Sequence, residues 1–162
     1  MDNRTDKFNY YLDIADSVLE RSTCLRRKYG AIIVRNDEII STGYNGAPRG
    51  RQNCSDLGRC TRELLNIPSG ERYELCRSVH AEANAIISAS RRDMIGADLY
   101  LVGREASTHA LLPHATSCSM CKRQVINAGI HRIIIRRSET EYEIVPVQEW
   151  VDNDDSIFDL SL

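Results

Sequence analysis

Apolar side chains recur near the start of the chain with the spacing of an amphipathic helix. They stand among charged residues at Phe8, Leu12, Ala15 and Leu19. Because an α-helix has about 3.6 residues per turn, these four positions share one face. The pattern predicts a helix over residues 7 to about 21 that packs through this apolar stripe.

Short runs rich in β-branched residues form a second pattern. The first two runs, residues 31–34 and 39–42, are separated by a polar stretch, which is a hairpin signal. A Gly-Tyr-Asn-Gly-Ala-Pro sequence then begins at Gly43 and breaks the strand pattern. Three further strands are predicted at residues 98–102, 130–135 and 142–147.

Two more helices are predicted, at residues 78–92 and 118–128. Ser78 and Ser117 are the expected N-caps, because a serine side chain accepts hydrogen bonds from the first free amides of a helix. Gly129 is the expected stop of the second helix. The apolar face of the first helix is expected to contain Val79, Ala83, Ile86 and Ile87.

Residues 47–77 form the least regular part of the sequence. The segment is polar, rich in arginine and holds three cysteines. A short helix over residues 61–66, ended by Pro68, is its one predicted regular element. A loop of this length is uncommon in a compact domain unless it is functional or is tied down.

The order of these elements predicts one mixed sheet with helices packed on its faces. With 162 residues, 42% of them hydrophobic and 27% charged, we expect a single domain over residues 1–162 with an acidic tail from about residue 152. A net charge of −2 speaks against a nucleic-acid partner, since such proteins usually carry a basic excess.

The chain has no apolar run of membrane-spanning length and no apolar segment at its start. We therefore expect neither a membrane span nor a signal peptide, and a cytoplasmic protein. In that compartment, six cysteines indicate metal binding or catalysis rather than disulfides.

One imidazole, one carboxyl group and two thiols stand at the two later helix starts. They belong to His80, Glu82, Cys118 and Cys121. Zinc prefers nitrogen and sulfur ligands, and a catalytic zinc keeps three protein ligands and one open position for water. The imidazole and the thiols would supply those ligands, which leaves Glu82 free to carry protons. This H-x-E and C-x-x-C pattern is typical of zinc-dependent nucleobase deaminases.

With these motifs in place, the chain resembles the cytidine and deoxycytidylate deaminase superfamily, and within it the dCMP deaminases. The resemblance also rests on residues 23–34, 43–48 and 127–130, and it covers roughly residues 8 to 136. It implies a three-layer α/β/α cytidine deaminase-like fold with a five-stranded mixed sheet and helices on both faces. It further implies homo-oligomers, commonly hexamers, that are regulated by dCTP and dTTP.

The implied reaction is the hydrolytic deamination of dCMP, or of a related pyrimidine nucleotide, to dUMP and ammonia. Zinc lowers the pKa of its bound water from about 15.7 towards 7. Glu82 would move protons from this water to pyrimidine N3 and to the leaving ammonia. The resemblance places the Asn45 side chain on the sugar. Further candidates for substrate contact are Arg26, Arg49, Ala81, His114 and Ser117.

Two departures from the family pattern are visible. Relatives usually have proline before the first zinc cysteine, whereas this chain has Ser117. The resemblance implies that a backbone carbonyl near this position meets the pyrimidine amino group, and a serine still supplies that carbonyl. The connection over residues 103–117 is also longer than in many relatives. Two other functions stay open, namely a tRNA or nucleoside deaminase of the same superfamily and a non-catalytic zinc-binding regulatory module. A slightly acidic charge disfavours the first, and an intact Glu82 disfavours the second.

The four remaining cysteines match in number the four thiolates of a closed structural zinc site. They are Cys24, Cys54, Cys60 and Cys76. Three of them lie in the irregular segment, to which a metal would give order. Some dCMP deaminases that the chain resembles carry a second zinc on cysteines matching Cys24 and Cys54. Separate buried thiols, or disulfides in an oxidising compartment, are the alternatives.

Overall fold

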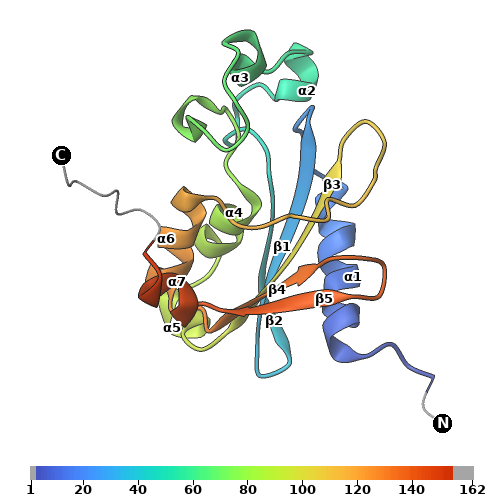
Figure 1. Cartoon of the computed structure of the whole chain (residues 1–162), viewed down its shortest axis with the longest axis vertical. Helices are drawn as coiled ribbons and strands as arrows, with labels where there is room; N and C mark the ends of the chain where they lie inside the picture. Colours follow the sequence, from blue (N-terminus) through green and yellow to red (C-terminus); the bar gives the residue numbers. More distant parts are fainter. Residues whose placement is uncertain (1–2, 155–162) are drawn as a thin grey trace.

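A five-stranded mixed sheet forms the centre of the computed structural model, which describes residues 3–154. The strand order is β2-β1-β3-β4-β5, and only β3 and β4 pair in parallel (Figure 1). The mixed five-stranded sheet confirms the predicted fold class. Its strands are β1 (Arg27–Arg35), β2 (Glu38–Tyr44), β3 (Asp98–Glu105), β4 (Arg132–Arg136) and β5 (Tyr142–Pro146).

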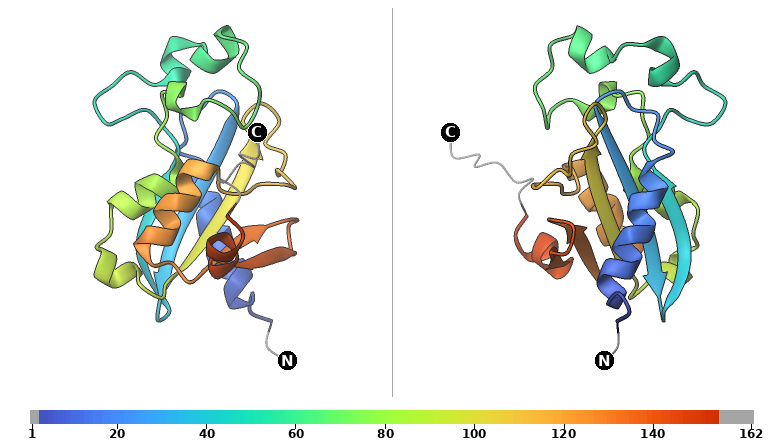
Figure 2. Two further views of the ribbon diagram at one scale, coloured as in Figure 1. Left: turned by 60° about the vertical axis from the view of Figure 1, so that its left-hand side comes forward. Right: turned by 90° about the vertical axis from the view of Figure 1, so that its right-hand side faces the viewer.

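Helices cover both faces of this sheet. Helix α1 (Lys7–Leu19) packs on one face, and α4, α5, α6 and α7 lie on the other (Figure 2). Successive side chains of a strand point to opposite faces. Ile32 accordingly joins the core beneath α1, while Ala31 and Ile33 join the core beneath α4 and α6. The result is the three-layer arrangement that the resemblance implied.

The first helix follows its apolar stripe closely. Leu12, Ala15 and Leu19 are fully buried against the sheet. The helix begins after Asp6, whose carboxylate accepts a hydrogen bond from the Asn9 amide, and it ends at Leu19, earlier than the predicted residue 21. The predicted helix is therefore confirmed, with a shorter C-terminal end.

The first hairpin places α4 close to the sheet. Asn36 and Asp37 form its two-residue turn with positive φ angles of 51° and 62°, as tight hairpins between twisted strands require. Further along β2, a β-carbon added to Gly43 would lie 2.3 Å from the Ala81 carbonyl oxygen and 2.4 Å from the Ala85 amide nitrogen. Only glycine lets the helix approach the strand this closely.

The predicted single helix over residues 78–92 is wrong, because Ser90 caps a second helix there by accepting a hydrogen bond from the Asp93 amide. The chain forms two helices there, α4 (Ala81–Ile87) and α5 (Arg91–Met94). Ala81 and Ala85 are buried, whereas Ile87 is 72% exposed, so the predicted apolar face is wrong at that residue. A helix that touches Gly43 needs small residues on the contact face, and periodicity of large apolar residues does not reveal it.

Two predicted N-caps are also corrected. His80 rather than Ser78 caps α4, and Cys118 rather than Ser117 caps α6 (Ser119–Ala128). Neither capping residue forms a side-chain hydrogen bond to its helix, which leaves both side chains available for another partner. Helix α6 ends at Gly129 with a φ of 83°, as predicted.

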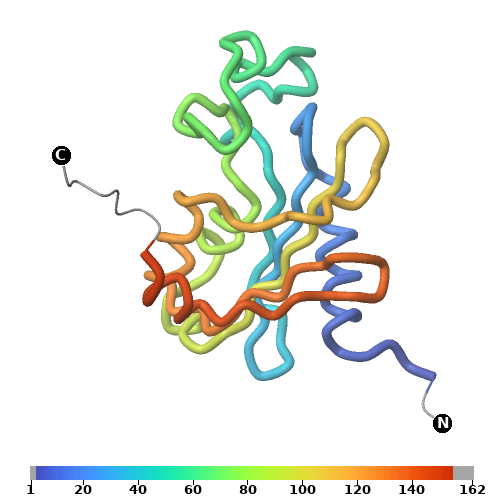
Figure 3. The backbone as a smooth tube through the Cα atoms, in the orientation of Figure 1, coloured from blue at the N-terminus to red at the C-terminus, as the bar shows by residue number. Residues whose placement is uncertain are grey.

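The irregular segment forms a separate layer at one end of the sheet (Figures 1 and 3). Two backbone hydrogen bonds between Gly46 and Val79, of 2.7 and 3.2 Å, close its base. The predicted helix over residues 61–66 is present as the shorter α3. The segment contains three short helices: α2 (Cys54–Leu57), α3 (Thr61–Leu64) and the 3-10 helix η1 (Tyr73–Leu75).

The last described element is α7 (Gln148–Asp152), at the start of the predicted acidic tail. Asp155 of that tail lies outside the described residues. Between residues 3 and 154, no helix combines the length and the apolar character needed to cross a membrane.

Candidate metal centre and active site

Three of the predicted ligands meet where α4 and α6 begin. His80 precedes α4, while Cys118 precedes α6 and Cys121 lies in its first turn. The two helices pack against each other, so their N-termini bring the side chains together. The Nδ1 atom of His80 lies 3.4 Å from each sulfur, and the three donor atoms lie within 4.8 Å of one another.

These separations fit a zinc ion. Zinc–nitrogen bonds of about 2.05 Å and zinc–sulfur bonds of about 2.3 Å, set at tetrahedral angles, place nitrogen and sulfur about 3.5 Å apart. Hydrogen bonds from Cys121 and His80 lower the pKa of the Cys118 thiol, while the pKa of its neighbour Cys121 is raised by Cys118 and by burial. The thiolate is the form that binds metal, so the geometry of all three donors and the surroundings of Cys118 suit zinc.

Glu82 belongs to the same site and is the second residue of α4. Its side chain projects from the start of α4 into the cavity beside His80, and the residue is only 4% exposed. Burial raises the pKa of the Glu82 carboxyl above its ordinary value. A carboxyl group with a raised pKa accepts and releases protons more readily near neutral pH, which suits a general acid–base group.

The cavity in front of these groups is lined by strand ends and by the irregular segment. Tyr73, from η1, sets its ring edge-on to the His80 imidazole, with 5.2 Å between the ring centres. Tyr29, from β1, is buried enough to raise the pKa of its hydroxyl to about 12. Both tyrosines line the same cavity as the predicted ligands His80 and Cys118, and neither was among the site residues expected from the sequence.

Asn45 lines the cavity but is already engaged with the protein. Its Oδ1 atom accepts hydrogen bonds from the Ser22 hydroxyl at 2.6 Å and from the Tyr29 amide at 2.9 Å. Its Nδ2 atom donates to the Arg27 carbonyl at 2.8 Å. An amide nitrogen carries two hydrogens, so one remains for a ligand in the cavity. Asn45 therefore joins the ends of β1 and β2 as well as facing the site.

Arginines line the wall opposite the predicted zinc ligands. Arg26 is one of them and pairs with Glu63 at 3.0 Å. Arg62, which sequence reasoning left unassigned, is only 6% exposed and lies with its guanidinium carbon 4.3 Å from the centre of the Tyr73 ring. An arginine eleven residues before a tyrosine in a polar segment gives no distinctive sequence signal.

The other predicted substrate contacts divide into two groups. Ala81 lines the cavity. Arg49 and His114 are exposed and are not among the residues that line it. Ser117 is buried, while its neighbours Thr116 and Cys118 line the cavity.

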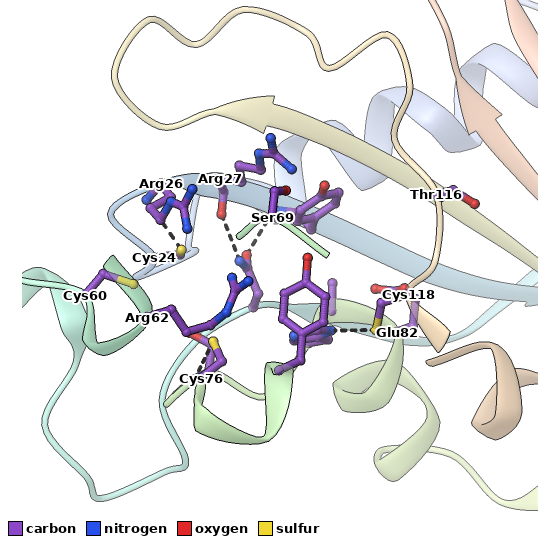
Figure 4. A pocket seen from close by; sticks show the side chains of 16 residues that line it. Cys24, Arg26, Arg27, Cys60, Arg62, Ser69, Cys76, Glu82, Thr116 and Cys118 are labelled. Carbon is purple, nitrogen blue, oxygen red and sulfur yellow. Dashed lines mark hydrogen bonds between the residues drawn. The ribbon is translucent and has the colours of Figure 1, made fainter. Parts of the chain in front are cut away.

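The remaining four cysteines gather on the far side of the cavity. Figure 4 shows Cys24, Cys60 and Cys76 there, across from Glu82 and Cys118. Cys54 is buried, and the pKa of its thiol is raised by burial and then by Cys24, Cys76 and Cys60.

All six cysteines are free thiols. Within residues 3–154, the four sulfurs are less tightly gathered than the first ligand set, which is the one group of donor atoms lying within 4.8 Å. Cys76 also contacts the first site: burial alone would raise the pKa of its thiol, but hydrogen bonds from His80 and the Ser78 backbone lower it.

Comparison with known proteins identifies the motif. Residues 5–137 match the family described as the cytidine and deoxycytidylate deaminase zinc-binding region. The deoxycytidylate deaminase of Mycobacterium phage D29 is 38% identical over 137 residues, which cover 82% of this chain and 95% of the phage protein. The deoxycytidylate deaminase of Schizosaccharomyces pombe is 30% identical over 80% of this chain, which spans only 37% of the yeast protein.

Solved structures share the fold. The dCMP deaminase of cyanophage S-TIM5 in its apo form has a TM-score of 0.58 at 24% identity, covering 82% of this chain and 84% of that one. The cytidine deaminase of Burkholderia pseudomallei has a TM-score of 0.53 at 16% identity, covering 85% and 91%. At these identities the likeness establishes the arrangement of the sheet and its helices.

Proposed function

This chain belongs to the cytidine and deoxycytidylate deaminase family, and we propose that it converts dCMP and water to dUMP and ammonia. One observation carries the proposal. A single cavity has a zinc ligand set and the buried Glu82 at one end and the buried Arg62 at the other. The zinc ligand set and Glu82 suit the deamination of a base, and Arg62 suits a substrate that carries a charged phosphate.

The chemistry divides between the metal and Glu82. Zinc held by His80, Cys118 and Cys121 supplies a Lewis acid that lowers the pKa of water. Glu82 accepts a proton from the attacking water and delivers it to pyrimidine N3. It then transfers a second proton to the amino group at C4, which leaves as ammonia while oxygen stays on the ring. The products are dUMP and ammonia, and Glu82 returns to its starting state.

Two groups hold the base and sugar in this proposal. The first backbone amides of a helix have no partner within the helix, so the Ala81 amide at the start of α4 donates to the pyrimidine carbonyl. The free hydrogen on Asn45 Nδ2 reaches the sugar. Because Asn45 is fixed by three hydrogen bonds to its surroundings, it presents this donor without losing side-chain entropy on binding.

Arg62 is the group that we assign to the 5′-phosphate. It donates hydrogen bonds to the carbonyls of Pro68 and Glu71, at 2.8 to 3.2 Å. Among residues 3–154, however, no carboxylate forms an ion pair with it. A buried cation without a counter-ion is costly, and a phosphate would provide that counter-ion through charge-assisted hydrogen bonds.

We also propose a second, structural zinc on Cys24, Cys54, Cys60 and Cys76. The support is that the four thiols gather beneath a polar segment with little apolar core, where a metal would add folding free energy. Six reduced cysteines also suit a cytoplasmic protein, since glutathione keeps thiols reduced there.

A homo-oligomer, with a hexamer as the expected size, completes the proposal, together with regulation by dCTP and dTTP. The exposed apolar side chains of Ile87 and Ile95 stand beside α4 and α5 and would be covered by a second subunit. Light scattering with and without these nucleotides measures both properties.

The deciding experiment is ammonia release from a substrate panel. The panel contains deoxycytidine, dCMP, dCTP and tRNA, each with the zinc-loaded protein. We expect kcat/KM to be highest for dCMP. Equal values for dCMP and deoxycytidine would assign a nucleoside deaminase, and release from tRNA alone would assign a tRNA deaminase. No release from any substrate would leave the non-catalytic zinc-binding module.

A further inference from the structure

The connection from β3 to α6 carries the first thiol of the predicted zinc site. It crosses the sheet and ends at Cys118, which caps α6 (Figure 1). Thr116 and Cys118 both line the cavity. Residues 106–118, all of which the structure describes, belong to no helix and to no strand of the sheet. The place of the Cys118 sulfur therefore depends on contacts between this connection and other parts of the molecule.

The side chain of Arg137 makes such a contact. Arg137 directly follows β4, and its Nη1 atom donates hydrogen bonds to the carbonyls of Pro113 at 3.1 Å and Ala115 at 2.7 Å. The Ala115 carbonyl belongs to the peptide group that joins Ala115 to Thr116, and a peptide group is planar. The hydrogen bond therefore fixes the orientation of the chain at the point where it reaches the cavity.

A carboxylate fixes the guanidinium group of Arg137 in turn. Glu143, on β5, accepts hydrogen bonds from the Nε atom at 2.8 Å and from the Nη2 atom at 2.6 Å. A guanidinium group is planar and its five N–H donors have fixed directions, so the pairing with Glu143 directs Nη1 to the connection. The Arg137 side chain is 25% exposed, so these bonds are partly shielded from water.

We propose that Arg137, held by Glu143, is a positioning residue that fixes residues 113–116 so that the Cys118 sulfur stands at the metal site. Neither Arg137 nor Glu143 lines the cavity, so both act through the backbone of the connection. This inference rests on the proposed function. It adds a part of the β4–β5 hairpin to the machinery, whereas the site residues expected from the sequence lie on other elements.

Metal binding tests the proposal without turnover. Cobalt(II) accepts the same ligands as zinc, and its visible absorption bands depend on the arrangement of those ligands. Groups that orient a metal ligand from outside the coordination shell typically contribute about 10- to 100-fold to metal affinity or activity. In Arg137→Met we therefore expect the cobalt bands to shift and the dissociation constant for cobalt to rise about tenfold. Metal on the four other cysteines would contribute equally to every variant.

A conservative variant separates the shape of the side chain from its charge. Arg137→Lys keeps the charge, but an ammonium group is a single point donor that cannot serve Glu143 and two carbonyls in one plane. Its cobalt affinity should lie between those of wild type and Arg137→Met, with a band shift in the same direction. These readings decide the proposal even if Arg137→Met does not fold.

Arg91→Met is the matched control. Arg91, on α5, also donates to a backbone carbonyl, that of Asn127 at 2.9 Å, but this carbonyl lies at the opposite end of α6 from Cys118. Its cobalt bands and affinity should equal those of wild type. With zinc in excess, we expect kcat for dCMP to fall about tenfold in Arg137→Met and to stay unchanged in Arg91→Met. Melting temperatures are measured on the same samples.

The possible results distinguish this role from the proposed reaction. Unchanged cobalt bands and affinity in the Arg137 variants would overturn the positioning role. Equal losses in Arg91→Met would also overturn it, because the effect would then come from the general stability of α6. A wild-type protein that does not deaminate dCMP would overturn the proposed function, while the cobalt measurements would still decide whether Arg137 positions the ligand.

Discussion

The guanidinium group of Arg104 donates two hydrogen bonds of 2.7 Å to the carboxylate of Asp16, one to each oxygen. Arg104 lies on β3 and Asp16 on α1, so the pair joins the first helix to the middle of the sheet. A second arginine, Arg136 from β4, donates to the same carboxylate at 3.2 Å and is only 2% exposed. Asp16 thus pairs with two largely buried cations, of which Arg104 also pairs with Glu139 and Arg136 also pairs with Asp13.

Replacing Asp16 by asparagine should strongly destabilise the fold. Two buried guanidinium groups would lose their shared counter-ion, which typically costs about 3–5 kcal/mol in unfolding free energy. Urea denaturation measures the change. Asp13→Asn is the matched control, because Asp13 also lies on α1 and also pairs with Arg136. Its side chain is 60% exposed, so we expect the unfolding free energy to fall by at most about 1 kcal/mol. Equal losses in both variants would contradict this role for Asp16.

The same carboxylate predicts how stability depends on pH. Burial alone would raise the pKa of Asp16, but hydrogen bonds and charge from Arg104 and Arg136 lower it below its ordinary value of 3.8. A pKa lowered in the folded state gives stability that is present above the unfolded-state pKa and is lost as pH falls through the folded-state pKa. The difference in unfolding free energy between wild type and Asp16→Asn should therefore be constant near neutral pH and shrink below about pH 4. A difference that grows on acidification would contradict this sign.

Replacing Glu82 by glutamine should abolish most deamination while leaving the metal and the fold in place. The amide keeps the shape of the side chain but cannot accept a proton. General acid–base groups contribute about 100- to 10,000-fold to rate, and Glu82 serves several steps, so we expect a loss at the upper end. Ammonia release, zinc content and melting temperature are measured together. A variant that keeps half of the wild-type kcat would exclude Glu82 as the proton carrier.

Replacing Arg62 by methionine should weaken the reaction with dCMP and spare the reaction with deoxycytidine. Loss of a charge-assisted contact to the phosphate predicts a fall of about 10- to 100-fold in kcat/KM for dCMP. Arg51→Met is the matched control, because Arg51 lies in the same segment but is exposed and away from the cavity. If both substrates lose activity equally, Arg62 acts only by holding the carbonyls of its own segment.

Metal content tests the second zinc. The purified wild-type chain should carry two zinc ions, and Cys54→Ser should carry one and melt at a lower temperature, because structural zinc binding is coupled to folding. Ser55→Ala, at the exposed neighbouring position, should keep both ions. One zinc per wild-type chain would rule out the second site.

Much of the fold follows from patterns that are local in sequence. Helix α1 could be predicted from the stripe that contains Leu12 and Ala15, and the sheet from the β-branched runs. Each of these elements buries apolar side chains at regular spacing. The first ligand set could be predicted for a similar reason, since His80 and the Cys118–Cys121 pair each carry a recognisable spacing. These residues meet because they lie at the starts of two helices, and the start of a helix can be recognised in a sequence.

What could not be predicted depends on contacts between distant segments. The burial of Ala81 and Ala85 on α4 follows from the approach of this helix to Gly43, which is a property of the packed structure. Arg62 and Tyr73 come into contact within an irregular segment, whose sequence shows neither helical nor strand periodicity. Such pairs share no local pattern, so sequence periodicity does not identify them.

The pair of backbone hydrogen bonds between Gly46 and Val79 has an evolutionary consequence. It closes the irregular segment at its base, so the chain leaves and re-enters the domain at one fixed point. The entropy of closing a loop rises by only about 0.6 kcal/mol for each doubling of its length. The segment between these two residues can therefore be lengthened, shortened or exchanged while β1 and β3 remain paired. Since this segment supplies Arg62 and Tyr73 to the cavity, recombination at Gly46 and Val79 would exchange part of the cavity lining while Glu82 stays in place on α4.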